Sequence, residues 1–165
     1  MLKLKAIDLN FLKVFFLDFD GVLTNNKVIV NEKGLESVIC SRSDGLYSEM
    51  IKKKFLIDII IISSEKNDVV KIRSKKMKLP CVQGVPDKLI YIKNFIKEKN
   101  LNFKNLAYIG NDLNDYEAMK KCYIRISPSD AVPEIKKISN FVLKTKGGDG
   151  VLREVYNEFS KTKKN

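Results

Sequence analysis

Residues 15–24 read Phe-Phe-Leu-Asp-Phe-Asp-Gly-Val-Leu-Thr, and this segment is the most informative in the chain. An apolar run ends in two carboxylates, Asp18 and Asp20, which Gly21 follows directly. Residues i and i+2 of a strand point to the same side, so both carboxylates can face one ligand. Two acids at the end of a buried strand are costly unless a cation or a substrate compensates their charge. The pattern therefore indicates a carboxylate nucleophile, a carboxyl group for proton transfer and a divalent metal. The alternative is an acidic Asp-Gly turn that merely ends a strand.

The length and composition predict one ordinary domain. A chain of 165 residues with 44% hydrophobic content can bury a real core, so residues 1–165 are expected to form a single domain. No apolar run approaches the roughly 18 residues that span a membrane, and the first residues do not resemble a signal peptide. Cys40, Cys81 and Cys122 are scattered, which predicts free thiols and a cytoplasmic location.

The net charge of +11 restricts the partners. The lysines are spread along the predicted helices and the termini, without the interleaved aromatic residues typical of nucleic-acid binding. We therefore expect a small anionic substrate and no nucleic-acid partner. The chain contains no histidine, so any acid–base chemistry must use carboxylates, lysine or tyrosine.

Apolar runs alternate with amphipathic stretches along the chain. This alternation predicts an α/β fold, a Rossmann-like three-layer sandwich with a central parallel sheet. Residues 27–40 predict a β-hairpin insertion after the first strand, with its turn at residues 31–34. The expected strands are 11–19, 56–62, 81–83, 106–109, 123–126 and 141–143, and the expected helices are 43–54, 67–78, 87–98, 115–121, 131–138 and 150–159.

Polar residues follow three of the predicted strands. Asp18, Ser63 and Asp112 each lie at or just past a strand's carboxyl end, which is the edge where open α/β sheets bind ligands. The Ser63 and Ser64 hydroxyls and nearby backbone N–H groups could hold phosphate oxygens. A helix N-cap ahead of residues 67–78 explains the two serines equally well.

Two further residues suit the same chemistry. Lys88 follows a Gly/Pro turn and could neutralise both the nucleophile and a transferring phosphoryl group, although a solvated surface lysine is the simpler interpretation. Asp112 could complete an all-oxygen Mg²⁺ shell, since Mg²⁺ prefers carboxylates, carbonyls and water. Its alternative role is that of a helix cap.

Together these motifs resemble the four signature motifs of the haloacid dehalogenase-like phosphohydrolases, over nearly the whole chain. The resemblance implies that Asp18 attacks phosphorus and forms an aspartyl-phosphate. Asp20 would protonate the leaving oxygen and then activate water, while Ser63 and Lys88 hold the phosphoryl group.

The same resemblance implies the metal and its support. Mg²⁺ would be bound by Asp18, the backbone carbonyl of Asp20, and Asp112, and Asp115 would support Lys88. Asn111 stands where the family frequently has Asp, which leaves that position's contribution open.

The spacing of the motifs leaves no room for a cap domain. Only 43 positions separate Asp20 from Ser63, and 25 separate Ser63 from Lys88. Because a reactive acyl-phosphate must be sequestered from water, a neighbouring subunit is the expected cover.

The chain is most similar to the capless tetrameric sugar-acid phosphatases, the 3-deoxy-octulosonate 8-phosphate phosphatases and their nonulosonate 9-phosphate relatives. A similar domain is fused to some CMP-sialate synthetases. The resemblance implies a homotetramer built by the hairpin, and a Gly-rich segment that can reach an active site. The matching segments are residues 41–46, 62–67, 83–88 and 147–155.

The substrate within this group rests on a departure from its pattern. The octulosonate enzymes usually carry Thr-Gly-Arg where this chain has Ser63-Ser64-Glu65. Glu65, followed by Arg73 and Lys76, resembles the nonulosonate branch. Glu65 could accept hydrogen bonds from sugar hydroxyls, and Arg73 and Lys76 could meet the substrate carboxylate; the alternative is an ordinary charged helix face.

We therefore expect a KDN or N-acylneuraminate 9-phosphate phosphatase, with 3-deoxy-D-manno-octulosonate 8-phosphate as the alternative substrate. An alternative of another class is a catalytically silent oligomerisation module that partners a CMP-sugar-acid synthetase. The presence of Asp18, Asp20, Lys88 and Asp112 together argues against the silent module.

Overall fold

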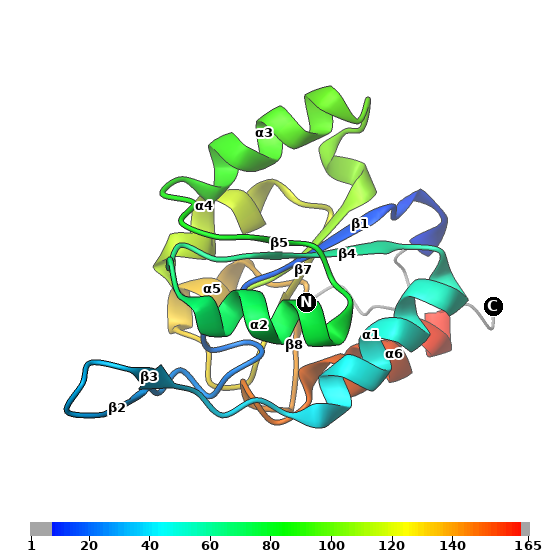
Figure 1. Cartoon of the computed structure of the whole chain (residues 1–165). Helices are drawn as coiled ribbons and strands as arrows, with labels where there is room; N and C mark the ends of the chain where they lie inside the picture. Colours follow the sequence, from blue (N-terminus) through cyan, green and yellow to red (C-terminus); the bar gives the residue numbers. More distant parts are fainter. Residues whose placement is uncertain (1–7, 163–165) are drawn as a thin grey trace.

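The computed structural model describes residues 8–162 (Figure 1). Its centre is a six-stranded, all-parallel sheet in the order β5-β4-β1-β6-β7-β8. Strands β1 and β4 are nearly continuous apolar runs, as expected of parallel strands buried on both faces. The strands are β1 (Val14–Leu17), β4 (Asp58–Ile62), β5 (Cys81–Val82), β6 (Leu106–Ile109), β7 (Ile124–Ser127) and β8 (Phe141–Val142).

Six helices cover both faces of this sheet, which confirms the predicted three-layer α/β sandwich (Figure 1). One face packs against α1 (Arg42–Phe55), α2 (Asp68–Met77) and α6 (Val151–Thr162). The other face packs against α3 (Lys88–Glu98), α4 (Leu113–Lys121) and α5 (Pro133–Ile138). No described helix has the length and apolar character that crossing a membrane would require.

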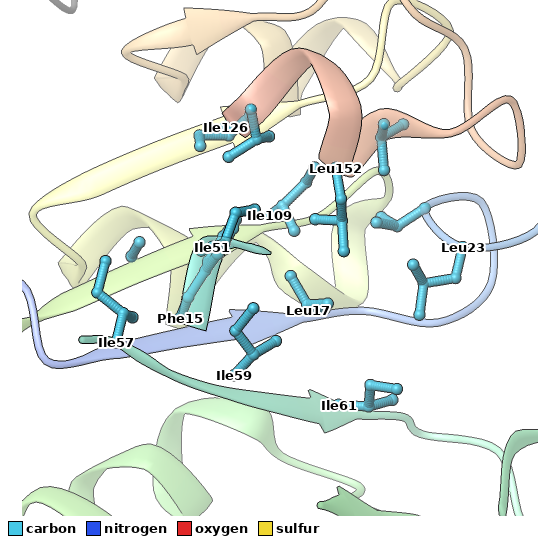
Figure 2. Packing of buried hydrophobic residues seen from close by; sticks show 14 of the residues in the cluster. Phe15, Leu17, Leu23, Ile51, Ile57, Ile59, Ile61, Ile109, Ile126 and Leu152 are labelled. Carbon is cyan, nitrogen blue, oxygen red and sulfur yellow. The ribbon is translucent and has the colours of Figure 1, made fainter. Parts of the chain in front are cut away.

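Strand β1 divides its side chains between two separate cores, because successive strand residues point to opposite faces. Phe15 and Leu17 join Ile51 of α1 and Leu152 of α6 on one side (Figure 2). Phe16 packs on the other side, where its ring meets Phe95 of α3 edge-on at 5.3 Å between centroids. The strand that carries the acidic pair is therefore held rigidly from both faces.

The register of the central strands sets the level at which they end. Leu17 of β1 pairs with Ile61 of β4 and with Ile109 of β6. The residues that follow these three strands therefore emerge side by side at one edge of the sheet. The chain order reverses here, with β4 on one side of β1 and β6 on the other, as at a ligand-binding switch point.

The hairpin lies outside the sheet. Strands β2 (Ile29–Val30) and β3 (Glu36–Ser37) are antiparallel and project beyond the carboxyl ends of the sheet, on the side where α2 begins (Figure 1). The Asn31 side chain shapes the turn by accepting hydrogen bonds from the backbone N–H groups of Lys33 and Leu35. The predicted hairpin and its turn are thus confirmed.

Several element bounds differ from the predictions. Strand β1 begins at Val14 rather than residue 11, because Leu9–Phe11 form a short 3₁₀ helix that the Asp8 side chain caps. Helix α4 begins at Leu113 rather than residue 115, because Asp112 is its N-cap. A second 3₁₀ turn, Phe103–Asn105, was not expected.

Candidate active site

The polar residues predicted at the strand ends do lie together. They surround an open cavity of about 270 Å³ at the carboxyl edge of β1, β4 and β6. We call it the catalytic cavity. Its lining residues are Asp18, Asp20, Asn26, Ser63, Ser64, Glu65, Asn111, Asp112 and Asn114.

A tight turn after β1 aims the acidic pair. The carbonyl oxygen of Phe19 accepts hydrogen bonds from the backbone N–H groups of Leu23 at 2.9 Å and Thr24 at 3.2 Å. The Thr24 hydroxyl oxygen in turn accepts one from the Gly21 N–H at 3.1 Å. Gly21 has φ +78°, and a Cβ there would lie 2.0 Å from Asn111 Nδ2, so a larger residue would strain the backbone and displace the Asn111 side chain.

Lys88 lies buried between two carboxylates. Its Nζ is 2.7 Å from Asp18 Oδ1 and 2.7 Å from Asp115 Oδ1, and only 2% of the residue is exposed. Asp18 and Asp115 are 3% and 0% exposed. The interpretation of Lys88 as a solvated surface lysine is wrong, because the start of α3 turns this side chain into the sheet edge.

Asp115 fixes the position of Lys88. Besides Lys88, its Oδ1 accepts a hydrogen bond from the Tyr108 hydroxyl at 2.8 Å, and its Oδ2 accepts one from the Asn111 N–H at 2.9 Å. Gly110 allows this approach, since a Cβ there would lie 2.5 Å from Asp115 Oδ2. Sequence reasoning missed Tyr108, because a tyrosine inside an apolar strand reads as core.

The buried cluster has an excess of negative charge. Burial raises the pKa of Asp18 to about 8, and the Asp115 charge adds to this effect against the opposing Lys88. Burial lowers the pKa of Lys88, but Asp18 and Asp115 outweigh it and raise that pKa above its usual value. One ammonium thus faces two carboxyl groups, and a further cation beside Asp18 would favour the ionised form of Asp18.

Asn111, whose role the sequence left open, places its side-chain amide beside the acidic pair. Its side-chain amide lies against Asp18 Oδ2 at 3.2 Å and the Asp20 carbonyl oxygen at 2.7 Å. With its nitrogen turned toward them, the amide donates two hydrogen bonds; with its oxygen turned there, three oxygens converge. Such an all-oxygen set is the kind that Mg²⁺ prefers.

Asp112 has a different environment. It lines the catalytic cavity, but its Oδ1 accepts a hydrogen bond from the Leu113 N–H at 2.7 Å as the N-cap of α4. Within residues 8–162, no three acidic or cysteine side chains gather closely enough to bind an ion by themselves. A metal at this edge therefore needs the Asp20 carbonyl or the Asn111 amide, and with these donors the residues present fit Mg²⁺.

The loop after β4 presents two hydroxyls to the cavity. Ser63 is buried, and its Oγ accepts a hydrogen bond from the Glu65 N–H at 3.1 Å. Ser64 Oγ lies 3.4 Å from Asn114 Nδ2. The N-cap of α2 is Asn67, whose side chain accepts from the Val69 N–H, so the interpretation of the two serines as helix caps is wrong.

Arg73 and Lys76 do not join this site within one chain. The Arg73 guanidinium donates to the Ser41 carbonyl oxygen at 2.7 Å. Lys76 is exposed on α2, about 13 Å along the helix from Asn67. Neither residue lines the catalytic cavity.

Comparison with known proteins agrees with this architecture. Residues 48–155 match the family model of the haloacid dehalogenase-like hydrolases. The chain is 28% identical over 145 residues to the 3-deoxy-D-manno-octulosonate 8-phosphate phosphatase KdsC of Escherichia coli K12, covering 87% of this chain and 77% of that protein. The KdsC protein of Salmonella typhimurium matches with the same identity and coverage.

A solved structure shows the same fold. The 3-deoxy-D-manno-octulosonate 8-phosphate phosphatase of Moraxella catarrhalis, in complex with magnesium, phosphate and a KDO molecule, superposes with a TM-score of 0.89. It is 28% identical, and the match covers 96% of this chain and 91% of that one. Because the family match spans about two thirds of the sequence, this chain belongs to the haloacid dehalogenase-like hydrolases and is a phosphatase.

Proposed function

We propose that the chain is a Mg²⁺-dependent phosphomonoesterase that hydrolyses the phosphate ester of a 3-deoxy-2-keto sugar acid. The observation that carries the proposal is the Lys88 ammonium, buried 2.7 Å from Asp18 beside an open cavity. A fixed cation next to a strand-end carboxylate suits the transfer of a dianionic phosphoryl group. The magnesium, phosphate and KDO molecule in the Moraxella catarrhalis complex support the same chemistry.

In the first step, an oxygen of Asp18 attacks phosphorus and the bond to the ester oxygen breaks. The carboxyl group of Asp20 gives its proton to the departing oxygen, which leaves as an alcohol. Burial raises the pKa of Asp20, and the charges of Glu65 and Glu36 raise it further, which favours the protonated form. Lys88 and the Ser63 hydroxyl hold the phosphoryl oxygens.

In the second step, the carboxylate of Asp20 takes a proton from water. The resulting hydroxide attacks phosphorus, which releases inorganic phosphate and restores Asp18. Asp115 keeps Lys88 in place through both steps and does not touch the substrate.

The metal would be held by Asp18, the Asp20 carbonyl and a donor from the loop after β6. Asp112 is the predicted donor, and the Asn111 amide, which lies 3.2 Å from Asp18 Oδ2 and 2.7 Å from the Asp20 carbonyl oxygen, is a second candidate. When bound, Mg²⁺ would neutralise charge on the transferring phosphoryl group.

The similar proteins and the local sequence support two different candidate substrates. The names of the similar proteins support 3-deoxy-D-manno-octulosonate 8-phosphate. Ser63-Ser64-Glu65, where the octulosonate enzymes usually carry Thr-Gly-Arg, supports a nonulosonate 9-phosphate such as KDN or N-acylneuraminate 9-phosphate. We prefer the nonulosonate ester, because Glu65 lines the catalytic cavity and could accept hydrogen bonds from sugar hydroxyls.

A homotetramer would complete the site. The exposed apolar side chains Val28, Ile29, Val30, Leu35 and Ile39 support an interface on the hairpin, since each exposes more than half of its surface. We further propose that residues 1–165 form a single domain without a separate cap. A neighbouring subunit could then cover its active site. Arg73 and Lys76 could meet the substrate carboxylate only from such a neighbour.

The remaining proposals rest on composition. The three free cysteines are compatible with a reduced, cytoplasmic location. Neither nucleic acid nor a membrane is proposed as a partner, and the positive net charge would attract the small anionic phosphorylated sugar acid.

The test is Mg²⁺-dependent release of phosphate from purified protein, with the nonulosonate and octulosonate esters compared side by side. We expect turnover of both, with a higher kcat/KM for the nonulosonate ester, and a preference that shifts toward the octulosonate ester in Glu65→Arg. An unchanged preference in Glu65→Arg would refute the assignment of specificity to Glu65. Absence of phosphate release from a broad ester panel would instead favour the silent oligomerisation module.

A further inference from the structure

A second cavity opens beside the catalytic cavity, between the hairpin and the start of α2. Its volume is about 310 Å³, and we call it the hairpin cavity. Asp20, Asn26 and Glu65 line both cavities, so the two adjoin at the proposed proton donor. The part of an ester that lies beyond the leaving oxygen would therefore extend from Asp20 into the hairpin cavity.

One wall of the hairpin cavity is apolar. Val28 and Val38 come from the two arms of the hairpin, and Val69 and Val70 come from the first turn of α2. Four branched side chains from two separate elements form a surface suited to the C–H face of a carbon chain. An apolar wall of this kind would not bind the charged phosphoryl group itself.

The charged side chains that line the hairpin cavity are acidic. Glu36 and Glu65 line it, and Asn67 donates a hydrogen bond from Nδ2 to Glu36 Oε2. Among residues 8–162, no lysine or arginine lines this cavity.

We propose that the hairpin cavity is a leaving-group subsite that selects an uncharged, hydroxyl-bearing carbon chain next to the phosphoester, with Glu36 as a specificity-determining residue. The valines would pack against the C–H face of that chain, and Glu36 and Glu65 would accept hydrogen bonds from its hydroxyls. A carboxylate at the same place would face two like charges without a cation. This inference rests on the proposed function and deepens it.

The subsite limits where the acidic group of a sugar-acid substrate can be. Its carboxylate must lie at the end of the carbon chain far from the phosphate, outside the hairpin cavity. Short phosphorylated acids, whose carboxylate is two or three carbons from the ester oxygen, are excluded by charge and not by size.

The test uses two small esters of nearly equal shape, glycerol 3-phosphate and 3-phosphoglycerate, which differ by a hydroxymethyl group in place of a carboxylate. Their inhibition constants are measured against whichever ester of the panel the protein hydrolyses best. We expect the wild-type protein to bind glycerol 3-phosphate more tightly. Glu36→Gln keeps an acceptor for Asn67 and should reduce that preference about threefold or more, as expected for one unit charge a few ångströms away.

Two further variants complete the design. Glu36→Lys should reverse the preference, while Glu32→Gln, on the same hairpin but lining neither cavity, should leave it unchanged. The inference is overturned if the ratio of the two constants is the same in Glu36→Gln and wild type, or if the wild type shows no preference. Failure of the proposed function is a separate result, namely that no ester on the panel is hydrolysed.

Discussion

Gly147 lies so close to Gly21 that a Cβ on Gly147 would be 2.1 Å from the Gly21 carbonyl oxygen. The segment after β8 thus packs directly on the turn that carries Asp20. The Gly148 N–H joins the segment to the turn by donating to the Val22 carbonyl oxygen at 3.0 Å. The Gly147 N–H donates to Asp130 Oδ1 at 2.9 Å, which fixes the segment on its other side. A segment more than 120 residues from the catalytic turn therefore supports its shape.

Gly147→Ala should consequently impair catalysis without touching the substrate. The added methyl group meets backbone atoms on the turn, which cannot move away unless Asp20 moves too. We expect an unfolding free energy lower by about 1–3 kcal/mol and a kcat lower by about tenfold or more. Gly45→Ala is the matched control: its Cβ would come no closer than 3.7 Å to Met77 Cγ, and both quantities should stay near wild type.

Asp18→Asn should abolish turnover and leave the fold intact. Because burial and Asp115 raise the pKa of Asp18, its charge is costly in the folded state without a metal. The variant should therefore melt at the same temperature as wild type, or higher, when Mg²⁺ is absent. Added Mg²⁺ should raise the melting temperature of wild type and have a smaller effect on the variant. Substantial residual turnover would contradict the covalent mechanism.

The two candidate metal donors after β6 can be separated by Mg²⁺ titration calorimetry. Since the Asn111 amide lies against Asp18 Oδ2 and the Asp20 carbonyl oxygen, Asn111→Ala should weaken Mg²⁺ binding about tenfold or more. Asp112→Ala removes the cap of α4 and should cost about 1 kcal/mol of stability. If Asp112→Ala weakens Mg²⁺ binding more than Asn111→Ala does, Asp112 is the ligand.

Tyr108 and Asp115 should differ in the size of their effects. Asp115→Ala leaves the Lys88 ammonium with one carboxylate fewer in a buried site and should lower stability by about 3–5 kcal/mol. Tyr108→Phe removes only the hydroxyl that donates to Asp115 Oδ1, and should lower it by about 1.5–3 kcal/mol. Both should lower kcat more than they raise KM, because they act through Lys88. Chemical denaturation and steady-state kinetics check the two expectations.

Asp44 predicts a pH dependence of stability. Its Oδ1 accepts the Leu152 N–H at the start of α6, its Oδ2 has no partner within residues 8–162, and burial raises its pKa to about 6. The folded state therefore holds a proton that the unfolded chain has lost, and this contribution to stability disappears as the pH rises from about 4 to about 6. The loss should be about 3 kcal/mol.

Denaturation of wild type and Asp44→Asn at pH 4 and pH 7 tests this expectation. The variant keeps an acceptor for Leu152 without the titrating group, so its stability relative to wild type should increase with pH. Asp58→Asn, at an exposed carboxylate at the start of β4, is the control and should show no such change. Equal differences at both pH values would contradict the role of Asp44.

The local patterns of the sequence predicted much of the fold. Continuous apolar runs identified the buried parallel strands, and the position of Asp18 just past such a run placed it at the sheet edge. Turn residues identified the hairpin. These features depend on neighbours within a few residues, so the sequence displays them directly. The observed strand and helix bounds differ from the predicted ones where a side chain caps a helix, as Asp8 and Asp112 do.

The candidate site was only partly visible. From its position in the sequence alone, Lys88 was more simply interpreted as a surface lysine. The role of Asp115 as its partner was inferred from the resemblance to a family. The sequence did not reveal the role of Tyr108, because its ring packs in the core while its hydroxyl donates a hydrogen bond to Asp115. Resemblance to the nonulosonate branch suggested Arg73 as a substrate ligand, and in the folded chain its guanidinium donates to the Ser41 carbonyl oxygen.

Short segments of the sequence therefore suffice to predict the alternating α/β architecture and the place of the two carboxylates after the first strand, because both predictions rest on local runs of apolar residues. The cation and the backbone segment that lie against those carboxylates and their turn depend instead on long-range packing. Lys88 is 70 residues from Asp18, and Gly147 is still farther from Gly21, so both contacts depend on how the strands are ordered and registered. Burial and charge pairing act between side chains that the packed sheet brings together, whatever their separation along the chain.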